Sequence, residues 1–166
     1  MRIVIVGDGK VGYTLTERLA SEGHDIVVID NNSRNLTALG NSLDVITVLG
    51  NGASYAVQRE AGVEHSDLLI AVTSMDEINM LCCLLAKKLG VKHTIARVRN
   101  PDYAEQLLYL KDELGLSMAV NPEMSAALEI GRMLRFPSAI KIETFARGRV
   151  DLVEYRIPAE STLCGM

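Results

Sequence analysis

The most constraining feature of the sequence is an apolar stretch that runs directly into a glycine-rich loop. Residues 2–6 read Arg-Ile-Val-Ile-Val and residues 7–12 read Gly-Asp-Gly-Lys-Val-Gly, which fits the spacing G-x-G-x-x-G. In a strand, loop and helix of this kind, Gly7 makes the tight turn, Gly9 lets the backbone approach a pyrophosphate, and Gly12 lets the helix pack closely on the strand. The sequence therefore predicts a nucleotide-binding fold.

A second feature is an acidic residue at the end of the next predicted strand. The helix that begins near Lys10 presents amide groups without intrahelical partners, and these groups together with the helix dipole favour a phosphate. Asp30 ends the apolar stretch at residues 25–30, where a Rossmann unit accepts hydrogen bonds from the ribose of adenosine. Strand, glycines, helix and acid occur in the required order. The alternative is a glycine-rich turn in a fold without a ligand.

The rest of the chain fits a doubly wound parallel sheet. Further apolar stretches predict strands at residues 45–49, 68–72, 94–98 and 117–120. The fold class is therefore α/β, a Rossmann-type doubly wound parallel sheet of six strands, followed by a small β-hairpin or linker. The hairpin strands are expected at residues 139–146 and 150–157.

The predicted domain organisation follows from these elements. We expect a nucleotide-binding domain at residues 1–137, and a hairpin or linker with the truncated start of a C-terminal domain at residues 138–166. The last residues carry no stop signal for a helix or strand, so we expect the chain to be the front portion of a longer protein.

Helix starts are predicted from capping residues. Ser33 is expected to cap a short helix, and Ser74 with Glu77 forms a capping box for the helix at residues 75–89. A further helix is expected at residues 53–61. Because Ser74 has this structural explanation, Thr73 is the better candidate for a ligand contact.

The predicted ligand site lies where the strand order reverses, at the carboxyl ends of the first and fourth strands. Arg97 at the end of the fifth strand is favoured over Arg99 as a contact for a phosphate or a ring, and the alternative for it is a surface charge. Gly50, Asn51 and Gly52 end the third strand at the same edge of the sheet. They let the backbone approach adenosine, or they simply form a turn.

Composition excludes several classes of protein. The formal net charge is −4, and the 17 Lys and Arg residues are spread along the chain, which argues against a nucleic-acid-binding surface. No apolar run approaches the ~20 residues that span a bilayer, so we expect no membrane insertion and a cytoplasmic location. Cys82, Cys83 and Cys164 lack the spacing of a metal or redox site, so core thiols are expected.

The order of these motifs resembles the cytosolic RCK/KTN domain of Trk-type potassium uptake regulators, the TrkA-like proteins. Besides the glycine loop and Asp30, the resemblance rests on the more specific runs at residues 71–80, 96–103 and 121–123. It implies a domain that binds NAD(H) and, in many members, ATP or ADP. It also implies a regulator without catalytic residues that acts on a membrane potassium transporter or channel at the inner face of the membrane.

The resemblance also assigns roles to residues of the site. It implies that the pyrophosphate contacts residues 7–11, the ribose contacts Asp30, and the second half of the nucleotide contacts Thr73, Ser74 and Arg97. No metal ligand is predicted. The full set of predicted cofactor-binding residues is Gly7, Asp8, Gly9, Lys10, Val11, Gly12, Asp30, Asn31, Arg34, Gly50, Asn51, Gly52, Thr73, Ser74 and Arg97.

One residue departs from the family pattern. Position 8 is commonly neutral in the family, whereas Asp8 places a negative charge in a loop that is expected to bind an anion. Either Lys10 offsets this charge or the Asp8 side chain points to solvent.

The competing function is that of an NAD-dependent dehydrogenase whose substrate domain is missing. Hydride transfer needs an acid or base beside the nicotinamide, but none of His24, His65 and His93 ends a strand at the predicted cleft. A third possibility is a module that kept the fold and lost the ligand, and the intact glycines weigh against it.

Two helices carry more apolar surface than one face of a sheet covers. They are the helices expected at residues 75–89 and 122–135. Exposed apolar patches of this kind mark interaction surfaces. We therefore expect a homo-oligomer, either a dimer or a larger ring.

Overall fold

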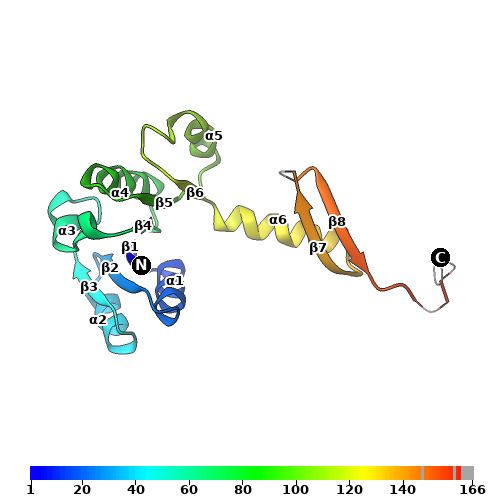
Figure 1. Cartoon of the computed structure of the whole chain (residues 1–166), viewed down its shortest axis with the longest axis horizontal. Coiled ribbons are helices and arrows are strands. Elements are labelled where there is room, and N and C mark those ends of the chain that lie inside the picture. Colours follow the sequence, from blue (N-terminus) through cyan, green and yellow to red (C-terminus); the bar gives the residue numbers. More distant parts are fainter. Residues whose placement is uncertain (147, 159, 162–166) are drawn as a thin grey trace. The chain divides into compact units, whose positions relative to one another are not determined.

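The computed structural model describes residues 1–146, 148–158 and 160–161, without the side chains of Ala104 and Leu108. It contains a six-stranded sheet with flanking helices, and then a helix followed by a two-stranded hairpin (Figure 1). The packing divides the chain into two compact units, Met1–Pro122 and the residues from Glu123 onward. A division by packing is not a folding boundary, so the expected domain limit at residue 137 stays a prediction.

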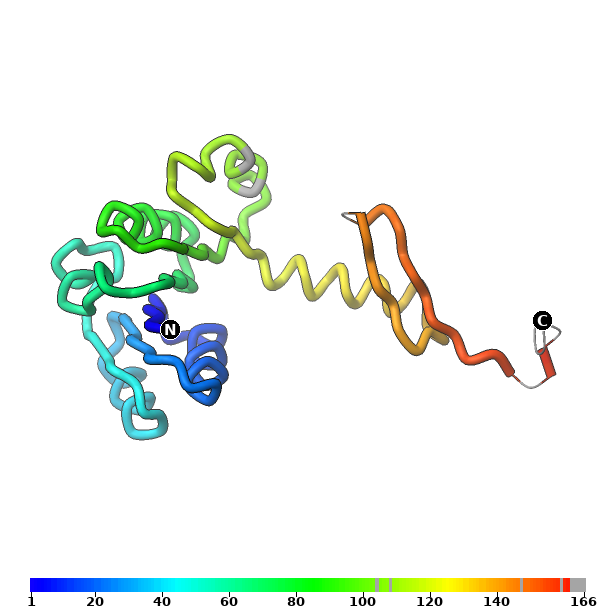
Figure 2. Tube along the Cα trace, viewed as in Figure 1, coloured from blue at the N-terminus to red at the C-terminus, as the bar shows by residue number. Residues whose placement is uncertain are grey.

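The sheet has the strand order of a doubly wound fold. Its strands are β1 (Arg2–Val6), β2 (Asp25–Asp30), β3 (Ile46–Leu49), β4 (Leu68–Ala71), β5 (His93–Arg97) and β6 (Met118–Val120). They pair in parallel in the order β3-β2-β1-β4-β5-β6. The chain therefore starts in the middle of the sheet (Figure 2). The order reverses between β1 and β4, which confirms the predicted fold class.

Helices cover both faces of this sheet. They are α1 (Lys10–Ser21), α2 (Ser33–Ser42), α3 (Tyr55–Glu60), the 3₁₀ helix η1 (Val63–His65), α4 (Asp76–Leu89) and α5 (Pro101–Leu110). Ile3 and Ile5 of β1 belong to the apolar cluster that includes Leu39 of α2. Val4 and Val6 belong to the cluster on the other face, which includes residues of α4. Because successive side chains of β1 are buried on opposite faces, the strand is apolar throughout.

Several predicted helix starts are wrong. α2 is capped by Asn32 and not by Ser33, because Asn32 Oδ1 accepts hydrogen bonds from the amides of Arg34 (3.0 Å) and Asn35 (3.4 Å). Ser74 does not cap the next helix, which begins at Asp76. The helix expected at residues 53–61 is shorter, since α3 begins only at Tyr55, after the N-cap position Ser54, and ends at Glu60 before η1.

The second unit contains α6 (Pro122–Arg135) apart from its first residue, and the strands β7 (Ala139–Phe145) and β8 (Val150–Tyr155). β7 and β8 pair antiparallel, which confirms the predicted hairpin. No residue of α6 is buried. Its large exposed apolar side chains are Met124, Leu128, Ile130, Met133 and Leu134. Residues 162–166, where the truncated start of a further domain is expected, lie outside the described residues.

Two of the predicted core thiols lie inside the first unit. Cys82 and Cys83 are buried in α4 without a disulfide, and burial raises the pKa of the Cys82 thiol to about 12. Cys164 lies outside the described residues. Within the described part of the chain, no helix is long and apolar enough to cross a bilayer.

Candidate functional site

The glycine loop is held in shape by contacts that leave no room for a side chain. Gly7 has φ +101°, and a Cβ atom there would lie 2.9 Å from the amide nitrogen of Thr73. A Cβ atom at Gly12 would lie 1.8 Å from the carbonyl oxygen of Gly7. The tight turn at Gly7 and the close packing of α1 at Gly12 therefore have the physical reasons that the sequence suggests.

Gly9 differs from the other two glycines of the loop, because a Cβ atom there would meet no protein atom within 4 Å. Gly9 occupies the N-cap position of α1 and provides no side-chain cap, and the first turn of the helix contains no acidic residue. The first amide groups of α1 thus lack intrahelical partners beside open space. Lys10 is exposed and Val11 is half-buried, so this helix start is suited to an anion.

Asp30 is oriented by two backbone amides. Asp30 Oδ2 accepts a hydrogen bond from the amide of Asp8 (2.6 Å), and Oδ1 accepts one from the amide of Asn32 (2.7 Å). A carboxylate oxygen has two acceptor sites, so each oxygen can accept a further donor. The carboxylate is half-buried at the end of β2, next to the glycine loop. It is therefore fixed in place and still able to accept a hydrogen bond from a ligand.

Asp8 is buried beside Asp30, so the expectation that its side chain points to solvent is wrong. The residue is 7% exposed, and its Oδ1 atom makes no hydrogen bond with any described residue. Burial raises the pKa of the Asp8 carboxyl, and the nearby Asp30 carboxylate raises it further. Asp8 thus introduces a second acceptor into the loop without a partner of its own.

The ends of β4 and β5 are joined by Asn79, a fully buried residue of α4. Its Oδ1 atom accepts hydrogen bonds from the amide (2.8 Å) and the hydroxyl (2.7 Å) of Thr73. Its Nδ2 atom donates to the carbonyl oxygen of Arg97 (2.9 Å). Because the hydroxyl proton of Thr73 is used within the protein, Thr73 offers a ligand its oxygen as an acceptor.

The two arginines after β5 have different surroundings. Arg99 Nε lies 3.5 Å from Asp76 Oδ1, and its guanidinium also donates to the carbonyl oxygen of Ser74. Asp76 Oδ2 accepts hydrogen bonds from the amides of Arg99 (2.8 Å) and Asn100 (2.8 Å). Arg99 is therefore part of the structure at the start of α4, and the half-buried Arg97 stays the predicted ligand contact.

The residues after β3 have a structural explanation of their own. A Cβ atom at Gly50 would lie 2.7 Å from the Val57 side chain, and one at Gly52 would lie 2.1 Å from that of Val6. Asn51 Oδ1 accepts a hydrogen bond from the amide of Ala53 (2.9 Å). These residues form a packed turn, and their contact with adenosine stays a prediction.

The remaining predicted residues lie on the surface near Asp30. Asn31 and Arg34 are both exposed. Arg34 belongs to the first turn of α2, where its amide donates to Asn32. Their contact with a nucleotide also stays a prediction.

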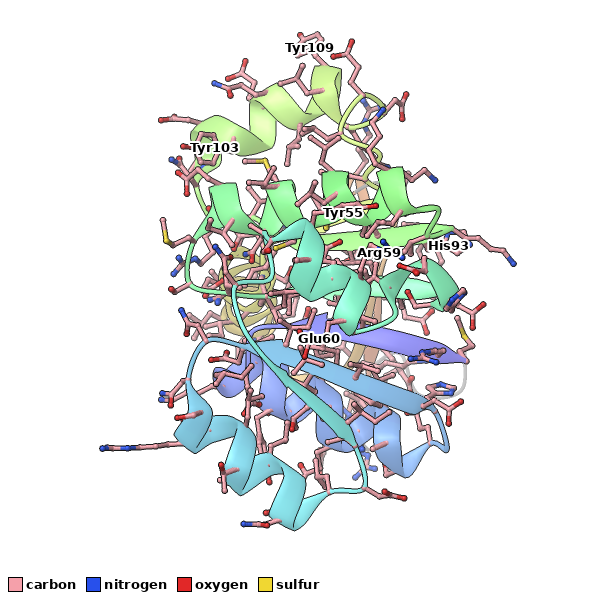
Figure 3. The ribbon with its side chains drawn as sticks, turned by 90° about the vertical axis from the view of Figure 1, so that its left-hand side faces the viewer. Tyr55, Arg59, Glu60, His93, Tyr103 and Tyr109 are labelled. Carbon is pink, nitrogen blue, oxygen red and sulfur yellow. The ribbon has the colours of Figure 1, made fainter. Side chains whose placement is uncertain are left out.

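The three histidines lie at the other edge of the sheet from the glycine loop, which follows the carboxyl end of β1. His24 precedes β2, His65 lies in η1 and His93 opens β5, so all three histidines lie at the amino-terminal edge of the sheet. Figure 3 shows His93 and Tyr103 on opposite sides of the view. The Tyr103 hydroxyl donates a hydrogen bond to Glu77 (2.6 Å). Among the described residues, no group of three or more His, Cys, Asp or Glu side chains could hold a metal ion.

Sequence reasoning missed the structural roles of Asn79 and Asp76. Both belong to α4 and both are buried. A signal existed for Asn79, since it is a polar residue inside the apolar stripe of its helix. Asp76 gave no separate signal, because an acid in the first turn of a helix is common at the surface as well.

A family model described as the TrkA-N domain matches residues 3–122. The chain belongs to the TrkA-N domain family. The matched range covers the six-stranded sheet, its helices and the glycine loop.

Similar proteins agree with the TrkA-N assignment. A Trk system potassium uptake protein TrkA homolog of Archaeoglobus fulgidus is 40% identical over 157 residues, which are 95% of this chain and 36% of that protein. The chain thus spans about a third of the length of this relative.

Solved structures show the same fold. The GsuK structure bound to ADP has a TM-score of 0.61 and 26% identity, covering 72% of this chain and 31% of that chain. The GsuK channel bound to NAD has a TM-score of 0.67 and 24% identity, covering 87% of this chain and 25% of that chain.

Proposed function

We propose that this chain is the nucleotide-sensing module of a regulator of potassium transport, and not an enzyme. The observation that carries the proposal is the glycine loop, where the first amides of α1 lie beside open space and Asp30 keeps acceptor capacity close by. The potassium uptake protein among its relatives and the nucleotide-bound GsuK structures support it. The chain spans about a third of the length of that relative. We therefore propose the control of a transporter for a full-length regulator and not for this chain alone.

The proposed ligand is NAD(H), with ADP and ATP as alternatives at the same place. The pyrophosphate would bind the amides between Gly7 and Gly12, and the ribose of adenosine would donate to Asp30. The second half of the nucleotide would extend toward Thr73, Ser74 and Arg97. Asn31, Arg34 and the turn at residues 50–52 would border the adenosine.

Calorimetry with NADH, NAD, ADP and ATP on one sample tests whether a nucleotide binds. We expect saturable binding of at least one of the four. The Asp30→Asn variant should bind more weakly than Asp25→Asn, which changes the same charge at the other end of β2. Binding of none of the four by the unmodified chain would contradict the proposal.

Selectivity between dinucleotides gives a second test of Asp30. A 2′-phosphate would bring a like charge to this carboxylate, and a hydrogen bond to a charged group contributes roughly 1.5–3 kcal/mol. NAD(H) should therefore bind more tightly than NADP(H), by on the order of tenfold or more. Equal affinities would mean that Asp30 does not face the ribose.

The dehydrogenase alternative predicts a different result. It requires an acid or base beside the nicotinamide, and the three histidines lie at the opposite edge of the sheet. We expect NADH to remain unoxidised with a panel of oxo- and hydroxy-acids. A sustained loss of NADH absorbance beyond a protein-free control would favour the dehydrogenase.

The partner we propose is a membrane potassium transporter or channel, contacted from the cytoplasm without membrane insertion. A flux assay in vesicles that contain a Trk-type membrane subunit, with and without the full-length regulator, tests this function. Nucleotide should change the potassium flux only when the regulator is present. The same flux under all conditions would contradict the proposed partner.

We also propose that the regulator is a homo-oligomer that uses α6. Leu128 of α6 is 55% exposed, and Leu49 of β3, in the other unit, is 58% exposed. If α6 is an interface, Leu128→Asp should lower the mass measured by light scattering, whereas Leu49→Asp should not. A monomeric unmodified chain at micromolar concentration would contradict this expectation.

A further inference from the structure

The glycine loop and the end of β2 bring two carboxylates together. The backbone amide of Asp8 donates to Asp30 Oδ2 (2.6 Å), so the two residues are neighbours although they lie far apart in the sequence. Among the described residues, neither carboxylate has a Lys, Arg or His partner within 4.0 Å. Two adjacent acids therefore form an acceptor site whose negative charge no Lys, Arg or His side chain among the described residues neutralises.

The Asp8 carboxylate is the less satisfied of the two. It is 7% exposed, and its Oδ1 atom has no hydrogen-bond donor among the described residues. Burying a charged acceptor without a donor is unfavourable, because the lost hydration is not replaced. A ligand that supplies O–H donors would replace it.

We propose that Asp8 is a second specificity residue, which with Asp30 forms a pair of acceptors for the 2′,3′-diol of an adenosine nucleotide and rejects a 2′-phosphate. This inference rests on the nucleotide binding proposed above. A ribose diol supplies two O–H donors, whereas ionised carboxylates can only accept. A phosphate group has the opposite property, since it brings negative charge and acceptors to a place that already has both.

Asp8 does not serve the pyrophosphate in this arrangement. The negative charge of Asp8 disfavours an anion beside it, whereas the amides at the start of α1 favour an anion. The loop therefore contains two subsites of opposite character. The amides after Gly9 bind the anionic part of the nucleotide, and the pair of carboxylates binds its neutral sugar.

The test uses calorimetry on the unmodified chain, Asp8→Asn and Asp25→Asn. Two pairs of ligands are compared, NAD with NADP and ADP with 2′-deoxy-ADP. In Asp8→Asn, the preference for NAD over NADP should fall by about tenfold, the effect of roughly one charged hydrogen bond. The preference for ADP over 2′-deoxy-ADP should fall as well. Asp25→Asn makes the same change of net charge at the exposed start of β2 and should leave both preferences unchanged.

The pairs of ligands separate sugar recognition from a general effect on the loop. If Asp8 only shapes the loop, the variant weakens all four ligands equally and both preferences stay the same, which would overturn the inference while the proposed function stands. If the unmodified chain binds none of these four ligands and neither NADH nor ATP, the proposed function fails and the inference fails with it. Asp8→Ala, checked for folding by circular dichroism, provides a second neutral variant that should lower both preferences in the same way.

Discussion

Asp8 and Asp76 are two buried acids of one unit with opposite surroundings. Asp8 is 7% exposed and Asp76 is 6% exposed. Asp76 accepts hydrogen bonds from two amides and lies near the Arg99 guanidinium. Oδ1 of neither acid accepts a hydrogen bond among the described residues, but Oδ1 of Asp76 lies 3.5 Å from Arg99 Nε, whereas Asp8 lies beside the Asp30 carboxylate. An acid whose partners are all within the protein serves the fold, whereas an acid without them has capacity left for a ligand.

The largest expected effect is at Asn79, which like Asp76 is a buried polar residue of α4 with hydrogen-bond partners inside the protein. Asn79→Ala removes the partners of Thr73 and of the Arg97 carbonyl oxygen inside a buried site. Unsatisfied buried groups cost about 1–3 kcal/mol each, so the free energy of unfolding should fall by about 3–4 kcal/mol. Urea denaturation measures the change. A fall in the free energy of unfolding below ~1 kcal/mol would show that water replaces the side-chain amide of Asn79 as a hydrogen-bond partner.

The next effect is at Asp76 itself. Asp76→Ala leaves the amides of Arg99 and Asn100 without an acceptor, and we expect a loss of about 2 kcal/mol in the free energy of unfolding. The preference for NAD over NADP should stay the same, because Asp76 lies at the start of α4. A changed preference for NAD over NADP would mean that Asp76, like Asp8, contributes to the choice of ligand.

A smaller effect is expected at Arg99. Its side chain is 41% exposed, so solvent screens its attraction to Asp76 and the pair contributes little. Arg99→Gln should lower the free energy of unfolding by about 0.5 kcal/mol. A loss as large as that of Asp76→Ala would mean that the charge pair, and not the two amides, is the main partner of Asp76.

The smallest effect, and the only gain, is expected for Asp8→Asn in the absence of ligand. The pKa of Asp8 is raised above its ordinary value of 3.8, so stability from this carboxyl is fully present below pH 3.8 and is lost as the pH rises through the raised pKa. The Asp8→Asn variant has no carboxyl group to ionise at this position, so it does not lose this stability as the pH rises. Its melting temperature should exceed that of the unmodified chain at neutral pH, and the difference should shrink toward pH 4. A constant difference across this range would contradict the expectation.

Much of the fold followed from the sequence, because strands that are apolar throughout and separated by helices allow few arrangements. The glycine loop also indicated the edge of the sheet where the strand order reverses. Its glycines are informative because no Cβ atom fits at Gly7 or Gly12. The capping residues were harder. Asn32 and Ser33 are both good caps, and the choice between them depends on where the backbone leaves β2.

The candidate site was less predictable than the fold. Nothing in the sequence indicates that Asp8 is buried, because its burial depends on the contact between the loop and the end of β2. Thr73 carried a hydroxyl at the right edge, but the sequence did not reveal that Asn79 uses its proton. Both features arise from residues far apart in the chain that meet only after the sheet has formed.

The missing Cβ atoms of Gly7 and Gly12 have a thermodynamic consequence. Since Gly12 packs against the carbonyl of Gly7, and Gly7 against the backbone of Thr73, contacts within the protein itself hold the loop in this shape. A ligand that binds there loses no affinity to the ordering of a mobile segment, which otherwise costs conformational entropy. The affinity of a nucleotide for this loop would then reflect the contacts it makes, so single substitutions in the loop should report those contacts directly.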